Sequence, residues 1–442
     1  MTAGCREVTL EGASGAPDAP VDLLAAWRPG GFLMERRGAG IVATGELRRI
    51  EVPAGPAQAT RAALMADAAL SDLGVGGAVV AAALPYEGDM PAGLLLPERV
   101  TVTSIQPRDL DLRARGARRA AGASCGTPPR RQRAVPEEAA VARGPATTHA
   151  PAPTHPAAVL RWRAEPSAAA YVRAVTEAIS TIRAGELEKV VLTRSLVAAN
   201  PGLDLLRLLA ELRRRDPDCH LFAAPAAGGG AFVGATPETL LRREGDRVVS
   251  LPHAGTAARS PDPGRDRQAA EALLHSAKDL HEHAAVVEVV ADTLAPHCAD
   301  LRVDSEPHLA ATAAVWHLAT AVRGRLRPSA PSALALAAEL HPTPAVCGTP
   351  RAVAGALIAR LEPASRGLYA GLVGWVDGRG DGEWAVSLRC ALVTRAAVRI
   401  HAGAGIVAES RPDLEVAETE VKFRTMVDAL EACAGTSGGA PA

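Results

Sequence analysis

Short apolar runs bounded by glycine and proline dominate the first 105 residues. Residues 75–86 (VGGAVVAAALPY) and 98–105 (ERVTVTSI) have the length and the β-branched content of strands, and the glycines and prolines around them are typical of turns. The pattern predicts a sheet. We therefore assign residues 1–105 to the N-terminal part of the fold.

A second patterned region begins near residue 166. Residues 167–184 show the apolar spacing of a helix that we expect to end at Gly185, and a β-branched strand follows at 189–195. Further helices are predicted at 266–294, 332–340, 351–360 and 415–433, and further strands at 230–237, 248–255, 368–377, 383–394 and 398–407. Several strands follow one another without a helix between them, which favours a mixed α+β fold over a doubly wound parallel one.

Between these regions, residues 106–165 are rich in Arg, Ala and Pro and poor in large apolar side chains. Such a composition is typical of a linker or a mobile excursion. We expect its arginines to be solvated charge, not a nucleic-acid arm. Residues 166–435 then form the largest ordered region.

The overall composition narrows the class of partner. The 442 residues include 48 basic and 49 acidic side chains, for a net charge of -1, which gives no electrostatic reason to expect nucleic acid or an anionic membrane. The seven cysteines form no C-x-x-C pair, and the chain shows no signal peptide and no run of 18 apolar residues. We expect a cytoplasmic protein with reduced thiols whose partner is a small molecule or another protein.

Lysine is rare in this chain and therefore informative. Only Lys189, Lys278 and Lys422 occur among the 48 basic residues, and each lies in a strongly patterned segment. Arginine stays protonated at any accessible pH, whereas a desolvated lysine can lose its proton and act as a base. Each lysine is thus a candidate for chemistry.

Two of these segments suggest an acid and a base. In KVVLTRS, the strand period of two places Lys189, Val191 and Thr193 on one face, where partial desolvation makes Lys189 a plausible general base. In GATPETLL, Glu238 follows a proline turn; it can be a catalytic acid or can cap a following helix.

Other segments suggest carboxylate binding. The turn at Gly255 and Thr256, followed by Arg259, combines free backbone amides with a cation. Residues 383–394 predict a strand with Arg389 on the same face as Ser387 and Ala391, and an inward arginine there needs an anion. In HAGAGIV, Gly403 and Gly405 permit close approach of a ligand to the backbone.

Two predicted helices carry acidic faces. Spacings of three, four and seven residues align Asp279, Glu282 and His283 on one helix, and Glu415, Glu418 and Lys422 on the other. Together these faces would form an oxygen-rich site that suits magnesium, whereas each face alone is ordinary solvated charge. A zinc site is disfavoured, because HEH at 281–283 is not the H-E-x-x-H pattern, and neither a P-loop nor a dinucleotide-binding glycine motif is present.

Ten motifs in order resemble the chorismate-utilising enzymes, most closely those that form isochorismate. They are KVVLTR, GATPETLL, PHAGTAAR, KDLHEH, VWHLAT, LHPTPAVCGTPR, YAGLVGW, GEWAVSLRCA, HAGAGIV and the closing E-x-x-E-x-x-x-K, and they span residues 168–432. The resemblance implies one large fold of two facing antiparallel sheets flanked by helices, with a magnesium-dependent active site between the sheets. Residues 166–435 would then be the chorismate-binding catalytic region.

The resemblance also implies a role for each matching residue. Lys189 would be the base that activates water for addition at carbon 2 of chorismate, and Glu238 the acid that protonates the departing carbon 4 hydroxyl. Glu282 and Glu418 match magnesium ligands, with Asp279 and Glu415 as outer acidic positions. The matches to substrate contacts are Gly255, Thr256, Gly403 and Gly405 through the backbone, and His317, Tyr369, Arg389 and Lys422 through side chains.

Departures within the family separate the possible reactions. Ala254 stands where aminodeoxychorismate synthases have a nucleophilic lysine, and Lys189 stands where anthranilate synthases have glutamine. Because water is the implied nucleophile, we expect no glutaminase subunit and a monomer. A salicylate synthase, which continues to eliminate pyruvate, and a non-catalytic chorismate-binding protein remain the alternatives. His253 is also unusual, because an aliphatic residue is more common there, and the downstream route, to menaquinone or to a siderophore, stays open.

Overall fold

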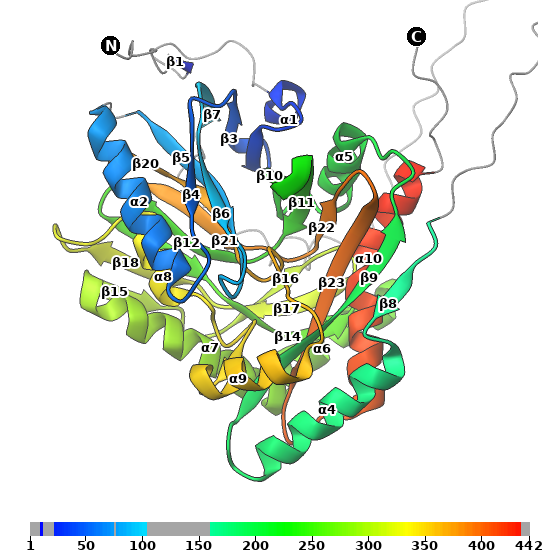
Figure 1. The fold of residues 1–442 in the computed structure, drawn as a ribbon. Coiled ribbons are helices and arrows are strands. Elements are labelled where there is room, and N and C mark those ends of the chain that lie inside the picture. Colours follow the sequence, from blue (N-terminus) through cyan, green and yellow to red (C-terminus); the bar gives the residue numbers. More distant parts are fainter. Residues whose placement is uncertain (1–8, 12–21, 75–76, 104–159, 435–442) are drawn as a thin grey trace, which may run out of the picture.

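Two large sheets and one small sheet form the body of the molecule (Figure 1). The computed structural model describes residues 9–11, 22–74, 77–103 and 160–434. Most of the predicted linker, residues 106–159, lies outside the described residues, but residues 163–165 of it pair with a strand of the first sheet. Within the described residues the pairing is antiparallel except between β1 and β7.

The strands of the three sheets have the following order and bounds. The eleven-stranded sheet runs β1 (Thr9–Glu11), β7 (Arg99–Thr103), β3 (Ala39–Thr44), β2 (Phe32–Arg36), β10 (His220–Ala226), β11 (Gly230–Thr236), β22 (Cys390–Val393), β23 (Ala397–Ile406), β9 (Lys189–Ala199) and β19 (Gly348–Thr349), with β8 (Arg163–Glu165) also on β9. The nine-stranded sheet runs β15 (Cys298–Val303), β18 (Val322–Leu326), β13 (Arg247–Leu251), β12 (Thr239–Glu244), β21 (Gly382–Val386), β20 (Leu372–Asp377), β5 (Val79–Leu84), β6 (Ala92–Leu96) and β4 (Arg48–Val52). The small sheet runs β14 (His253–Ala258), β17 (Val315–Ala319) and β16 (His308–Ala311).

Helices cover the outer faces of the large sheets (Figure 1). Against the nine-stranded sheet lie α2 (Gln58–Leu73) and α8 (Ala333–Leu340), and against the eleven-stranded sheet lie α4 (Ala168–Arg183), α5 (Leu205–Arg215) and α10 (Pro412–Ala434). The others are α1 (Leu23–Ala26), α6 (Pro263–His275), α7 (Ala277–Leu294) and α9 (Arg351–Leu361), with short 3-10 turns η2 (Ala227–Gly229) and η3 (Ala295–His297). None of the helices in the described ranges is both long and apolar enough to cross a membrane.

The core follows from the period of two along the strands. In β10, Phe222 belongs to a core cluster that it shares with Val80 and Trp384 of the nine-stranded sheet, whereas its neighbours Leu221 and Ala223 pack in a second cluster under the helices. Successive side chains thus fill the layer between the sheets and the layer beneath the helices. This arrangement confirms the predicted α+β class.

Three predicted elements are divided in the structure. The helix predicted at 266–294 breaks at Ser276, whose hydroxyl oxygen accepts a hydrogen bond from the Asp279 backbone N–H at 3.2 Å and so begins α7. The strand predicted at 248–255 breaks at Pro252, which has no N–H to donate, and its halves belong to different sheets. The strand predicted at 383–394 becomes β21 and β22, with Arg389 between them at φ 48°.

Candidate active site

One pocket collects the fourteen residues to which the motif resemblance gave a catalytic, substrate-binding or metal-binding role. Its volume is about 230 Å³. The lining includes Lys189, Glu238, Gly255, Thr256, Asp279, Glu282, His317, Tyr369, Arg389, Gly403, Gly405, Glu415, Glu418 and Lys422. Lys278 lines it too, so that all three lysines of the chain meet here.

Strand β9 and helix α7 bring the first ion pair together. Lys189, Val191 and Thr193 all line the pocket, as the period of two predicts. The Lys189 Nζ lies 2.8 Å from Glu282 Oε1, and their side chains are only 11% and 14% exposed. Asp279 and Glu282 face the pocket from the first turns of α7, because they lie three residues apart on one helix face.

Glu238 carries a deeply buried carboxyl group. It lies between β11 and β12, is 2% exposed, and its Oε1 atom has no partner among the described residues. Burial raises its pKa to about 8, against the opposing charges of Arg389 and Lys189. At neutral pH the group is therefore protonated. No helix follows it, so the alternative of a helix cap was wrong.

The turn that carries Glu238 is anchored to its neighbouring strand. Thr236 Oγ1 donates to the Val386 carbonyl at 2.6 Å, and the Val386 N–H donates to the Glu238 carbonyl at 3.2 Å. The Glu238 N–H in turn donates to Thr236 Oγ1 at 3.4 Å. These contacts fix the backbone on both sides of the acid.

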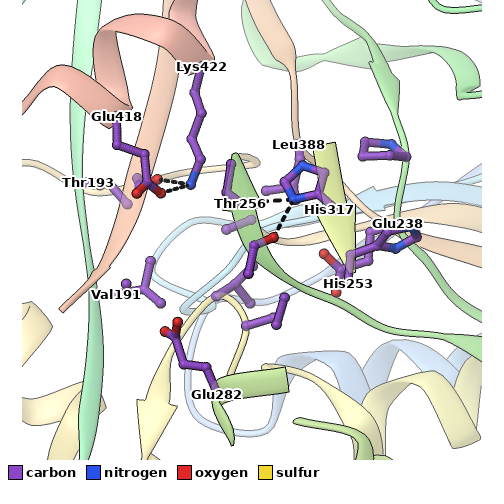
Figure 2. Close-up of a pocket in the computed structure, with 18 of the residues that line it drawn as sticks. Val191, Thr193, Glu238, His253, Thr256, Glu282, His317, Leu388, Glu418 and Lys422 are labelled. Carbon is purple, nitrogen blue, oxygen red and sulfur yellow. Dashed lines mark hydrogen bonds and ion pairs between the residues drawn. The ribbon is translucent and has the colours of Figure 1, made fainter. Parts of the chain in front are cut away.

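Helix α10 supplies the opposite wall, with Glu415, Glu418 and Lys422 all lining the pocket from one helix face as predicted. Figure 2 shows Glu418 and Lys422 side by side on this helix. Lys422 Nζ lies 2.5 Å from Glu418 Oε1 and donates to the Gly403 carbonyl at 2.8 Å. Burial, together with the charge of Glu418, raises the pKa of Glu415 to about 7. A bound cation would reduce the repulsion between these two carboxyl groups at the pocket wall.

The donor chemistry of this wall suits magnesium, although the described residues contain no preassembled group of three or more carboxylate, imidazole or thiolate ligands. Glu282 and Glu418 are each paired with a lysine. Magnesium is usually held by one or two carboxylates, with waters and substrate oxygens completing its shell. Glu282 and Glu418, with Asp279 and Glu415 nearby on the same helix faces, are the residues that could hold it.

A hydrogen-bonded chain defines the state of His317 (Figure 2). Its Nδ1 atom lies 3.1 Å from the Gly255 carbonyl and 3.2 Å from Thr256 Oγ1, and its Nε2 atom lies 3.3 Å from Arg389 Nη2. Because a carbonyl only accepts and a guanidinium only donates, Nδ1 carries the proton and Nε2 accepts. Burial and the Arg389 charge lower the pKa of His317 well below its usual value, so the ring is neutral.

The predicted strand position of Arg389 was wrong, but the expectation that its side chain needs an anion is kept. It does not lie in a strand beside Ser387 and Ala391; its φ of 48° places it in the left-handed region between β21 and β22. The side chain is 6% exposed, and its Nε atom has no hydrogen-bond partner in the described part of the chain. A buried guanidinium with an unused donor suits a carboxylate.

Tyr369 and three glycines complete the lining. Tyr369 is buried with its pKa raised to about 12, and its ring stacks on His401 at 5.0 Å between centroids. Gly255 has a φ of 73°, which favours glycine. A Cβ atom on Gly405 would meet Glu282 Oε1 and the Lys189 Cε, each at 3.0 Å.

The structure places two of the predicted residues away from the pocket and adds three lining residues that the sequence did not reveal. Arg259, expected at the carboxylate site, instead forms an ion pair with Asp266 and lies over the Trp316 ring at 4.2 Å. His283 is buried against Thr320, with 2.7 Å between Nε2 and Oγ1. Arg366 lines the pocket, as do Ala345 and Val346, yet the sequence reasoning missed all three. The sequence feature that could have identified Arg366 is Glu362, an acidic residue four positions before it with which it forms an ion pair.

Known proteins resemble this chain in both sequence and structure. The family model described as chorismate binding enzyme matches residues 131–431. The isochorismate synthase DhbC of Bacillus subtilis (strain 168) is 44% identical over 267 residues, which is 59% of this chain and 67% of that protein. The isochorismate synthase EntC of Escherichia coli (strain K12) is 37% identical over 377 residues, 85% and 86% of the two chains. The crystal structure of DhbC from Bacillus anthracis superposes with a TM-score of 0.76 at 34% identity, covering 92% of this chain and 98% of that one.

Proposed function

The chain belongs to the chorismate-binding enzymes, and on that basis we propose that it is an isochorismate synthase, an isomerase that adds water at carbon 2 of chorismate and expels the carbon 4 hydroxyl. The observation that carries the proposal is the pairing of two groups in one pocket. Glu238 is a buried carboxyl group protonated at neutral pH, and Lys189 is a partly buried amine on another element. A binding protein needs neither an acid nor a base.

The proposed reaction assigns one proton transfer to each group. Lys189, as the neutral amine, takes a proton from the attacking water, and Glu238 gives its proton to the leaving hydroxyl. Glu238 already holds the proton that it must give, because burial keeps it neutral. The Lys189 Nζ lies 2.8 Å from Glu282 Oε1, and this contact holds the amine at the pocket wall.

Substrate orientation falls to the other side chains and to the backbone. Chorismate carries two carboxylates, and Arg389, with its unused Nε donor, is positioned to bind one of them. Neutral His317 holds Arg389 through Nε2 and is held by the Gly255 carbonyl through Nδ1. The glycines at 255, 403 and 405 leave room for a ligand close to the backbone.

We propose magnesium as the cofactor, held by Glu282 and Glu418 with Asp279 and Glu415 nearby. Bound there, the ion would neutralise the ring carboxylate and restrict its motion. The support is the carboxyl-rich wall and the raised pKa of Glu415 beside Glu418. Removal of magnesium by a chelator should abolish turnover, and addition of excess magnesium should restore it.

We further propose that the enzyme acts in the cytoplasm as a monomer without a glutaminase subunit, because water is the nucleophile. Cys219, Cys298, Cys347, Cys390 and Cys433 are all free and buried, which fits a reducing compartment. Light scattering of the purified protein would test the monomer. A stable dimer would contradict it.

The deciding experiment is chromatographic product analysis after incubation with chorismate and magnesium. Lys189→Ala and Glu238→Gln are expected to lower kcat by about 10²–10⁴-fold, and Arg163→Ala, a change at an exposed ion pair on β8, serves as the control. Isochorismate from wild type alone supports the proposal. Salicylate with pyruvate would instead identify a salicylate synthase, and chorismate binding without turnover would identify a non-catalytic protein.

A further inference from the structure

We propose that the buried ion pair between Glu362 and Arg366 is a positioning device that replaces a missing strand beside Lys189 and so holds this lysine in place. The inference rests on the proposed role of Lys189 as the base. Within the described residues neither Glu362 nor Arg366 forms a hydrogen bond with Lys189; both bind the backbone that follows it.

One edge of β9 is continuously paired and the other is interrupted. Along the first edge, β23 pairs with β9 from Val190 to Ala199. Along the second, β19 pairs only with residues 189 and 190, and β8 pairs only with residues 195–197. Between them, residues 191–194 have no strand partner on this second edge among the described residues.

The ion pair occupies this gap. Arg366 Nη2 donates to the Val191 carbonyl at 2.7 Å. Glu362 Oε1 accepts from the Thr193 backbone N–H, and Oε2 accepts from the Thr193 hydroxyl, each at 2.9 Å. A carbonyl and an N–H that a neighbouring strand would otherwise satisfy are thus satisfied by two side chains.

The pair is itself rigid and deeply buried. Arg366 donates to Glu362 through Nε at 2.9 Å and through Nη2 at 2.6 Å, and the side chains are 1% and 7% exposed. A further donation from Nη1 reaches the Val346 carbonyl at 2.7 Å, and the guanidinium lies 4.3 Å above the ring of Tyr86. Few orientations of the arginine are compatible with all of these contacts.

The adjoining pocket explains why a buried ion pair, and not a strand, occupies this gap. Burying an ion pair carries a desolvation penalty that often exceeds its attraction, so stability alone does not account for it. Val191, Thr193, Val346 and Arg366 all line the pocket, and a strand through the gap would fill that space. The pair satisfies the backbone from one side and leaves the pocket open. Lys189, two residues before Val191, must be held closely because small displacements of a catalytic group are costly in rate.

The test uses variants that preserve charge neutrality, so that the fold is retained. Arg366→Lys keeps the positive charge but cannot span the Val191 and Val346 carbonyls as a fork does. Glu362→Asp keeps the negative charge but is one methylene too short. Glu165→Asp is the matched control, because it keeps the charge and shortens the side chain in the same way, and Glu165 forms an ion pair with Arg399 beside the end of β9 where strand pairing is intact.

Amide hydrogen exchange and steady-state kinetics are measured on the same samples. Both test variants are expected to exchange faster at residues 191–194 but not at 195–199, and to lower kcat by about 100-fold with KM nearly unchanged. The control should match wild type in both measurements. A merely structural pair would raise exchange throughout the chain and would not separate kcat from KM.

Three outcomes would overturn the inference: unchanged exchange at 191–194, faster exchange throughout the fold, or local loosening with full kcat. Failure of the proposed function looks different, because wild type itself would then make no isochorismate. In that case the exchange result still decides whether the pair holds this strand in place.

Discussion

Glu238 shows how the surroundings of one side chain set its chemistry. Its carboxyl group is removed from water, and the charges of Arg389 and Lys189 do not compensate for that loss, so its pKa rises to about 8. A proposed acid with this pKa can donate a proton at neutral pH without needing an acidic medium. Burial, and not a specific hydrogen bond, is the physical cause.

The activity of the enzyme should therefore depend on pH through this group. We expect kcat to fall as pH rises through about 8, because the deprotonated Glu238 cannot protonate the leaving hydroxyl. The measurement is kcat for isochorismate formation between pH 6 and pH 10 at saturating chorismate and magnesium. A rate that stays flat across pH 8 would contradict the assignment.

Stability should respond to the same titration. In the unfolded chain this glutamate has a pKa near 4.5, and in the folded chain near 8, so the folded state binds more protons between these values. The stabilising contribution is complete below about pH 4.5 and is lost as pH rises through about 8. Glu238→Gln cannot titrate, so the melting temperature of wild type relative to this variant should fall from pH 5 to pH 9. A constant difference would show that the carboxyl group is not buried in solution.

Strand β23 is the element on which close approach matters most. It pairs with β9 along residues 190–199, and its two pocket glycines face side chains instead of open space. A Cβ atom at Gly405 would press on both partners of the Lys189–Glu282 ion pair. The absence of a side chain there gives the pair its room.

Gly405→Ala should therefore damage activity more than folding. We expect kcat to fall by at least about tenfold, because the added methyl group displaces Lys189 and Glu282 by a fraction of an ångström. Gly355→Ala is the control: this glycine lies within α9 with open space around its Cβ position, so alanine should stabilise the fold by about 0.5–1 kcal/mol without a change in kcat. Thermal melts and kinetics on both variants test the contrast, and equal activities would contradict it.

The chain does not divide into two domains at residues 104–159, because the segments on either side share both large sheets. Strand β2, from the N-terminal segment, pairs with β10, and β5 pairs with β20, so both large sheets combine strands from before residue 103 and after residue 160. The N-terminal segment also supports the pocket wall, since the Tyr86 ring lies beneath Arg366 and its N–H donates to the Gly367 carbonyl at 2.9 Å.

A fragment of residues 160–442 should accordingly fail to fold by itself. Loss of β2 and β5 would expose the edges of β10 and β20 and uncover core residues such as Phe222, which is fully buried. Circular dichroism during heating should show no cooperative transition for the fragment, in contrast to the complete chain. A cooperative melt would mean that this region is an independent domain.

Local geometry explains which residue faces and which fold class could be predicted from the sequence alone. A strand repeats every two residues and a helix every 3.6, so the common face of Lys189, Val191 and Thr193 and the common face of Glu415, Glu418 and Lys422 follow directly from the order of the chain. The α+β class follows from the same patterns. The motif resemblance selected the lining residues for the same reason, because each motif is a short segment.

Contacts between distant segments required the folded chain. Glu282 meets Lys189 across a sequence separation of 93 residues, and Glu238 acquires its raised pKa from its burial in the folded chain. The left-handed backbone of Arg389 could not be predicted, because an arginine within an apolar run has the pattern of a strand. The Glu362–Arg366 pair was missed because its meaning lies in the gap along β9. Periodicity acts within one element, whereas burial, charge state and strand partners depend on how elements pack, and only the tertiary structure contains that packing.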